Sequence, residues 1–130
     1  MSIEVGLKGR FESVVTQEKT ATAVGSGLVP VFATPYMVAM MENAASDSLI
    51  PCLAPGESSV GTHLNIAHSS ATPVGMKVWA ESVVTAVEGR KVTFEVHAYD
   101  ERGEIGSGVH ERFIINAEKF MAKTQSKLEV

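Results

Sequence analysis

Apolar residues follow a helical spacing in one long stretch of the chain, residues 34–50. They recur there every three or four positions along one stripe, at Val38, Met41, Ala45 and Leu49. Thr34 is suited to cap the start of a helix, and Pro35 fits a first helical turn because its missing N–H costs nothing there. We therefore predict a helix of about four turns, buried over most of its circumference. Glu42 lies in its middle, either turned to solvent or held inside for a purpose.

The remaining segments alternate between apolar and polar residues, as β-strands do. The pattern predicts strands at residues 8–16, 20–24, 58–68, 76–87 and 91–99, and a last strand that ends near residue 115. Glu88-Gly89-Arg90 between two of them is a typical hairpin turn, and a short helical tail begins at Ala117.

The strand at residues 58–68 carries several polar candidates, so the face on which each side chain lies matters. Strict alternation places one group on one face of the sheet: Val60, Thr62, Leu64, Ile66 and His68. It places the other group on the opposite face: Gly61, His63, Asn65 and Ala67.

One long buried helix followed by a run of antiparallel strands indicates an α+β domain in which a curved sheet wraps around the helix. Gly106 and Gly108 in the last strand are suited to a bulge or kink that bends the sheet. The edge strands of such a sheet are exposed unless they are paired. We therefore expect a single domain, residues 1–130, that forms a homodimer or a larger assembly by joining two sheets edge to edge.

Composition narrows the classes of partner. Of the 130 residues 45% are hydrophobic and 20% charged, which is typical of one globular domain. A net charge of −4 without a basic stripe argues against nucleic acid. The single cysteine, Cys52, suits a reducing compartment, and no segment has the length and hydrophobicity of a signal peptide or a membrane span. We expect a cytoplasmic protein with neither nucleic acid nor membrane as partner.

The histidines do not indicate a metal site. His63 and His68 are five residues apart on a strand and therefore point to opposite faces. His110 belongs to no helical HExxH motif, and no cysteine–histidine spacing is typical of zinc. His97, between apolar neighbours, is most simply a surface residue of its strand. We predict no bound metal.

Three side chains that are ordinary one by one could together supply the groups for hydrolysis. Singly, Thr34 is a helix cap, Glu42 an outward-facing glutamate and His68 a histidine at the end of a strand. Hydrolysis of an ester or thioester requires a nucleophile, a base and donors for the oxyanion. A glutamate and a histidine supply the first two, and a helix N-terminus suits the developing negative charge. A glycine within a strand, Gly61, lets a ligand approach the backbone.

Three segments carry a resemblance to a known family: VFATPYMVAMMENA, GTHLNIAHSSATPVG and EIGSGVHERFIINAEKF. Together with the spacings between them, which span about residues 31–123, they resemble the hotdog-fold thioesterases of the fluoroacetyl-CoA thioesterase type. The resemblance implies a hotdog fold, a homodimer with active sites at the subunit interface, and an acyl-CoA thioester as the substrate without a further cofactor. It also implies roles for five residues: Thr34, Glu42 and His68 as the catalytic set, and Gly61 and Arg112 in substrate binding.

Two departures from the family pattern shape the expected chemistry. Residues 24–28 are small and lack the aromatic residues with which the fluoroacetyl-specific member covers its site, so we expect a different or broader acyl group. Pro35 after Thr34 removes one N–H from the helix start, which gives Gly61 more weight as the partner of the carbonyl.

The expected mechanism has Glu42 attacking the thioester carbonyl or activating a water, with Thr34 holding Glu42 and His68 protonating the CoA thiolate. Two alternatives stay open on the same fold. One is a non-catalytic module that binds acyl-CoA or another small ligand. The other is a hydratase or dehydratase that acts on acyl thioesters.

Overall fold

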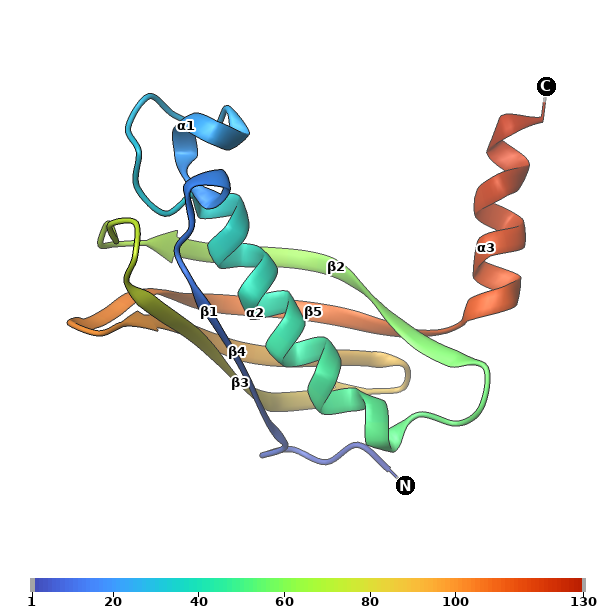
Figure 1. Cartoon of the computed structure of the whole chain (residues 1–130). Coiled ribbons are helices and arrows are strands. Elements are labelled where there is room, and N and C mark those ends of the chain that lie inside the picture. Colours follow the sequence, from blue (N-terminus) through green and yellow to red (C-terminus); the bar gives the residue numbers. More distant parts are fainter. Residues whose placement is uncertain (1, 130) are drawn as a thin grey trace.

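The computed structural model describes residues 2–129, which form one antiparallel sheet and one long helix (Figure 1). The sheet has five strands in the order β1-β3-β4-β5-β2. Their bounds are β1 Lys8–Val14, β2 Glu57–His68, β3 Lys77–Glu88, β4 Lys91–Asp100 and β5 Gly103–Asn116. The long helix, α2, spans Thr34–Leu49 and crosses the concave side of the sheet. The predicted α+β architecture, in which an antiparallel sheet wraps around one long helix, is confirmed.

The shorter elements lie at the two ends of the molecule. They are η1 Gln17–Lys19, α1 Ala21–Val24, η2 Ile50–Cys52, α3 Ala117–Gln125 and η3 Ser126–Leu128. Figure 1 shows the α1 region and α3 rising from opposite ends of the sheet, beyond the free edge of β2. None of the helices among the described residues is long and apolar enough to cross a membrane.

Three of the four residues of the predicted stripe on α2 are buried, Met41, Ala45 and Leu49, whereas Val38 is half-buried. The buried residues of the helix are Met37, Met40, Met41, Ala44, Ala45 and Leu49. Two details of the prediction are wrong: the cap is Ala33, with Thr34 the first helical residue, and the α-helix ends at Leu49 because Ile50 begins the 3-10 turn η2. Thr34 does not cap because its hydroxyl is bonded to His68 instead.

The strand predicted at residues 20–24 is wrong, because this segment forms the short helix α1. The side chain of Thr20 accepts a hydrogen bond from the N–H of Ala23, which caps the turn. Gly25 ends it in the left-handed conformation, with φ of 78°. These local capping contacts outweigh the weak strand preference of a segment that is only five residues long.

Strict alternation along β2 is also wrong, because the register against β5 shifts between Gly61 and His63. Such a bulge adds one residue and reverses the faces beyond it. Gly61 pairs with Arg112, and His68 pairs with Gly106, so both lie on the side of the sheet that faces α2. A second shift, between β4 and β5, lies beside Gly106, in agreement with the predicted bend there.

The sheet is covered unevenly. Helix α2 packs mainly against β1 and β3 and contacts β2 less. Its buried residues and the inward-facing residues of β3 and β4 form the core, which includes Val78, Ala80, Val92, Phe94 and Val96. Strand β2, at the end of the sheet order, keeps one hydrogen-bonding edge unpaired in the single chain. The concave face beside β2 is therefore the least covered part of the sheet.

Candidate active site

The first residue of α2 meets the last residue of β2. The Oγ1 atom of Thr34 lies 2.7 Å from the Nδ1 atom of His68, which is hydrogen-bond distance. Both line a pocket of about 250 Å³ whose wall is mostly small residues: Ala21, Ser26, Val31, Phe32, Ser69, Ser70 and Ala71. Two of the predicted site residues are therefore in contact, at the mouth of a small cavity.

The environment of His68 favours the neutral ring. Partial burial lowers the pKa of His68, although the nearby backbone of Ser70 acts in the opposite direction. The second ring nitrogen, Nε2, is buried and has no hydrogen-bond partner within the described residues. At pH 7 the imidazole thus has one nitrogen fixed by Thr34 and can accept a proton from a reacting group.

The other three predicted residues form a second group, near the middle of α2 and β2. The Oε2 atom of Glu42 lies 3.9 Å from the Nη1 atom of Arg112, so the two side chains form an ion pair. The side chain of Glu42 is 39% exposed and that of Arg112 is 8% exposed. Glu42 therefore lies neither in bulk water nor in an apolar enclosure, but beside a largely buried positive charge.

Arg112 is held by a network that sequence reasoning missed. Its Nε donates to the hydroxyl of Ser59 at 2.9 Å and its Nη2 to the Ser59 carbonyl at 3.0 Å. Its Nη1 lies 3.1 Å from the Nε2 atom of His110, whose Nδ1 lies 2.9 Å from the carbonyl oxygen of His63. The available signal was the alternation of β5, which puts His110 and Arg112 on one face.

Gly61 lies where these side chains converge. A Cβ atom on this residue would be 2.7 Å from Oε2 of Glu42, 3.1 Å from Cε1 of His110 and 3.5 Å from Nη1 of Arg112. Gly61 is not among the glycines with positive φ, so the requirement for glycine comes from space and not from backbone strain. Gly61, where the sequence predicts that a ligand approaches the backbone, therefore lies in close contact with Glu42 and Arg112.

No hydrogen bond or ion pair joins the two groups within residues 2–129. Thr34 and Glu42 are eight positions apart on one helix, about 12 Å along its axis. The expectation that Thr34 holds Glu42 is therefore not met within one chain, where the hydroxyl contacts His68. The structure therefore brings the predicted residues together in two groups. One is a pair, Thr34 and His68, and the other is a trio, Glu42, Gly61 and Arg112.

Donors for an oxyanion at the start of α2 are few. Pro35 has no N–H, and the N–H of Tyr36 donates to the carbonyl oxygen of Ala33 at 3.0 Å. The N–H of Met37 is directed to the same carbonyl at 3.1 Å. Two N–H groups of the first turn are therefore already engaged, and the assignment of Gly61 as the partner of the carbonyl stays a prediction.

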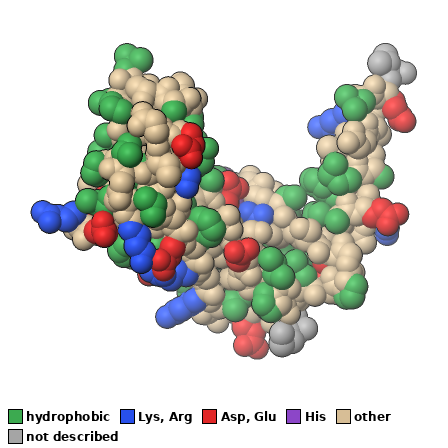
Figure 2. Space-filling view, viewed as in Figure 1, with side chains coloured by type: hydrophobic (Ala, Val, Ile, Leu, Met, Phe, Trp, Pro, Cys, Tyr) green, Lys and Arg blue, Asp and Glu red, His purple; other side chains and the backbone are tan. Residues whose placement is uncertain are grey.

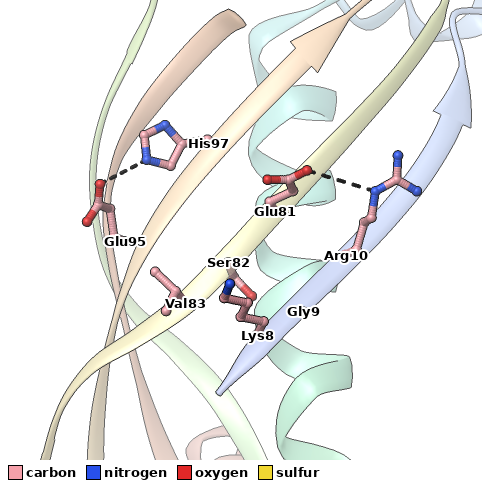
Figure 3. A pocket seen from close by; sticks show the side chains of 8 residues that line it. All are labelled: Lys8, Gly9, Arg10, Glu81, Ser82, Val83, Glu95 and His97. Atoms are coloured by element: carbon pink, nitrogen blue, oxygen red, sulfur yellow. Dashed lines mark hydrogen bonds and ion pairs between the residues drawn. The ribbon is translucent and has the colours of Figure 1, made fainter. Parts of the chain in front are cut away.

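A larger groove, of about 500 Å³, lies on the outer side of the sheet (Figure 3). It is lined by charged side chains, with Arg10 directed to Glu81 and His97 to Glu95 (Figure 3). It contains none of the five predicted site residues. Its side chains neutralise one another on an exposed strand face, so size alone does not make it the candidate site. His97 is a partly exposed strand residue, as predicted.

Comparison with known proteins points to one family. The family described as fluoroacetyl-CoA-specific thioesterase matches residues 15–118. The chain is 46% identical over 97 residues to the fluoroacetyl-CoA thioesterase of Streptantibioticus cattleyicolor, covering 75% of this chain and 70% of that protein. The solved structure of the fluoroacetyl-CoA thioesterase FlK is similar, with a TM-score of 0.92 and 38% identity over 98% of both chains. A thioesterase superfamily member from Thermus thermophilus superposes with a TM-score of 0.91 and 33% identity, covering 98% of this chain and 95% of that one.

Proposed function

The chain belongs to the fluoroacetyl-CoA-specific thioesterase family, and from this premise we propose that it is a homodimeric acyl-CoA thioesterase whose active site is shared between two subunits. Membership in this family makes the protein a thioester hydrolase, as the sequence predicts. The shared site is the finer part of the proposal. Thr34 and His68 come from one subunit, and Glu42, Gly61 and Arg112 come from the other.

The separation of the two groups is the observation that carries the shared site. Val38 lies midway between Thr34 and Glu42 on α2, and Leu64 and Asn65 lie midway between Gly61 and His68 on β2. A two-fold axis that passes these midpoints would exchange the ends of both elements. Such an axis would bring the pair of one subunit opposite the trio of the other, twice in each dimer.

The free edge of β2 supports this arrangement. An unpaired strand edge is a template for pairing with another chain, and an antiparallel contact between two β2 strands would form one continuous sheet. Figure 2 shows an open notch between the α1 region and α3, on the side to which β2 faces. The partner would occupy this notch and exclude water from the reacting groups, which strengthens electrostatic interactions in the site.

The proposed reaction begins with the thioester carbonyl directed to the N–H of Gly61 and the start of α2, where developing negative charge is stabilised. In the water route Glu42 removes a proton from water as the water oxygen bonds to the carbonyl carbon. The C–S bond then breaks, and the proton passes through His68 to the sulfur, giving the free acid and CoA. Because burial lowers the pKa of His68, its neutral ring accepts this proton before delivering it.

The covalent route uses the same residues. The Glu42 carboxylate bonds to the carbonyl carbon, the thiolate leaves and takes its proton through His68, and water then hydrolyses the mixed anhydride. Trapping of a labelled acyl group on Glu42 distinguishes this route from direct attack by water.

The acyl group is proposed to be short and not restricted to fluoroacetyl. The pocket beside Thr34 and His68 has a volume of about 250 Å³, which suits a small acyl chain. Residues 24–28 near its mouth contain no aromatic side chain, and Leu28 is 95% exposed in the single chain. A less enclosed entrance discriminates less between short acyl groups, since hydrophobic contacts that differ by one small group are worth little.

A panel of acyl-CoA thioesters tests the proposal. We expect release of free thiol, followed with a chromogenic disulfide, from acetyl-, fluoroacetyl- and other short acyl-CoAs, with turnover falling for long chains. Binding without thiol release would instead identify an acyl-CoA-binding module. Loss of the enoyl absorbance of an α,β-unsaturated acyl-CoA without thiol release would identify a hydratase.

A further inference from the structure

A buried histidine that the proposed mechanism does not use lies against the second group. His110 of β5 is fully buried and stacks on Phe94, with their ring centroids 6.0 Å apart. Its two ring nitrogens have separate partners: the carbonyl oxygen of His63 at Nδ1 and the guanidinium of Arg112 at Nε2. A buried titratable ring with both nitrogens engaged is held in a fixed orientation, and its partners favour one protonation state.

The partners define the tautomer. The His63 carbonyl oxygen can only accept, so the proton of a neutral ring lies on Nδ1. The Arg112 guanidinium can only donate, so Nε2 must present its lone pair to Nη1. The arrangement is therefore complete with a neutral ring, and a second proton on Nε2 would place two donors 3.1 Å apart.

From this geometry we infer that His110 is a positioning residue, which holds the Nη1 group of Arg112 toward Glu42 and Gly61. The inference rests on the proposed function, because Glu42 and Gly61 are the groups that would act on the thioester. Ser59 fixes the Nε and Nη2 side of the guanidinium, and His110 fixes the remaining corner. That corner is the atom that lies 3.9 Å from the Glu42 carboxylate.

The charges around His110 favour the state that this role requires. Burial, reinforced by the positive charge of Arg112, lowers the pKa of His110 against the opposing hydrogen bond to the His63 carbonyl. The carboxylates of Glu42 on α2 and Glu111 on β5 also oppose the shift, but the net direction is down. Phe94 of β4 adds only an apolar surface. The ring is therefore neutral at pH 7 and accepts from Arg112.

Acid should release this contact. Below its lowered pKa, His110 gains a proton on Nε2 and becomes a cation facing a cation, since Arg112 stays charged throughout. The guanidinium corner then loses its acceptor and is repelled from it. A misplacement of about 1 Å in a positioned group can cost about 10²-fold in rate.

Two substitutions separate positioning from simple packing. In His110→Gln the side-chain oxygen reaches the place of Nε2 and still accepts from Arg112, whereas in His110→Asn the shorter side chain replaces Nδ1 and leaves Nη1 without an acceptor. We expect kcat for acetyl-CoA to fall by about 10- to 100-fold in His110→Asn and by only a few-fold in His110→Gln, with similar KM values. Thermal unfolding should be similar in the two variants.

A matched control and a direct titration complete the test. His97→Gln, the same change on the outer face of the sheet, should keep the wild-type rate. In the wild-type protein the ring resonance of His110 should titrate with a midpoint below about 6.5, and Arg112→Met should move that midpoint upward. Equal rates in the Asn and Gln variants, or no response of the midpoint to Arg112→Met, would overturn the role of His110. Absence of thiol release by the wild-type protein would instead refute the hydrolase proposal, and with it this inference.

Discussion

The hydroxyl oxygen of Thr34 lies 2.7 Å from Nδ1 of His68, although 34 residues separate them in the chain. The contact joins the N-terminus of α2 to the C-terminus of β2 and fixes the orientation of the imidazole. It also leaves Nε2 as the nitrogen with no partner among residues 2–129. The hydrogen bond therefore holds the imidazole of His68 in one orientation at the start of α2.

Removing this hydroxyl should reduce turnover without removing the fold. Thr34→Val keeps the shape of the side chain but cannot bond to His68, so the ring loses its orientation. We expect kcat to fall by about 10- to 100-fold, measured as thiol release from acetyl-CoA. Thr34→Ser, which keeps the hydroxyl, should remain within a few-fold of the wild type. Equal activities for the Val and Ser variants would show that the hydrogen bond has no part in catalysis.

A methyl group added at Gly61 should displace the side chain of Glu42 and lower activity. In Gly61→Ala the new Cβ would lie 2.7 Å from Oε2 of Glu42, so the carboxylate must move away from its place beside Arg112. We expect a loss of about 10²-fold in kcat/KM, with a small change in the melting temperature because the backbone φ suits alanine. Both quantities should be measured on the same preparation, kcat/KM from thiol release and the melting temperature from thermal unfolding.

The control for Gly61→Ala is Thr85→Ala on β3. Thr85 is exposed and belongs to neither of the two groups of site residues nor to the free edge of β2. Its truncation should leave kcat/KM within a few-fold of wild type. A Gly61→Ala protein with normal kinetics would contradict the packing described around Glu42.

His97, on the outer face of the sheet, should contribute to stability in a pH-dependent way. Partial burial alone works against a charged His97, but hydrogen bonds to Glu95 and Glu104 raise its pKa overall. A raised folded pKa means that this stabilisation is fully present below the unfolded value of about 6.5 and is lost as pH rises through the folded value. The melting temperature of His97→Gln should therefore be lower than that of the wild-type protein at pH 6, and the two melting temperatures should become similar at pH 9. A deficit that grows with pH would reverse the sign and refute the assignment.

Whether an element can be predicted from the sequence depends on how many residues share its pattern. The long helix and four of the strands follow from periodicity over ten or more residues, where many positions agree. Helix α1 was missed because Thr20 and Gly25 define it through local capping of only four residues. The bulge after Gly61 was missed because one inserted residue leaves the alternation on either side intact.

The candidate site shows the same division. The chemistry of the residue types and the family resemblance both indicate Thr34, Glu42, His68 and Gly61, whereas the resemblance alone indicates Arg112. The structure places all five on the concave side. Which of them touch depends on the register of β2 and on the length of α2 between Thr34 and Glu42, and neither can be read from residue type. The contacts of Ser59 and His110 with Arg112 depend on side-chain packing between β2 and β5, which residue type and spacing do not define.

Complementation between two inactive variants tests the shared active site most directly. Glu42→Gln and His68→Ala should each lower turnover by about 10²–10⁴-fold as homodimers, since each removes a positioned acid or base. If the site is shared, a heterodimer of the two carries one intact site and one doubly altered site. Heterodimers isolated with two different affinity tags should then recover about half of the wild-type rate of thiol release. A heterodimer as inactive as its parents would mean that Glu42 and His68 act within one chain or not together, and would contradict the shared site.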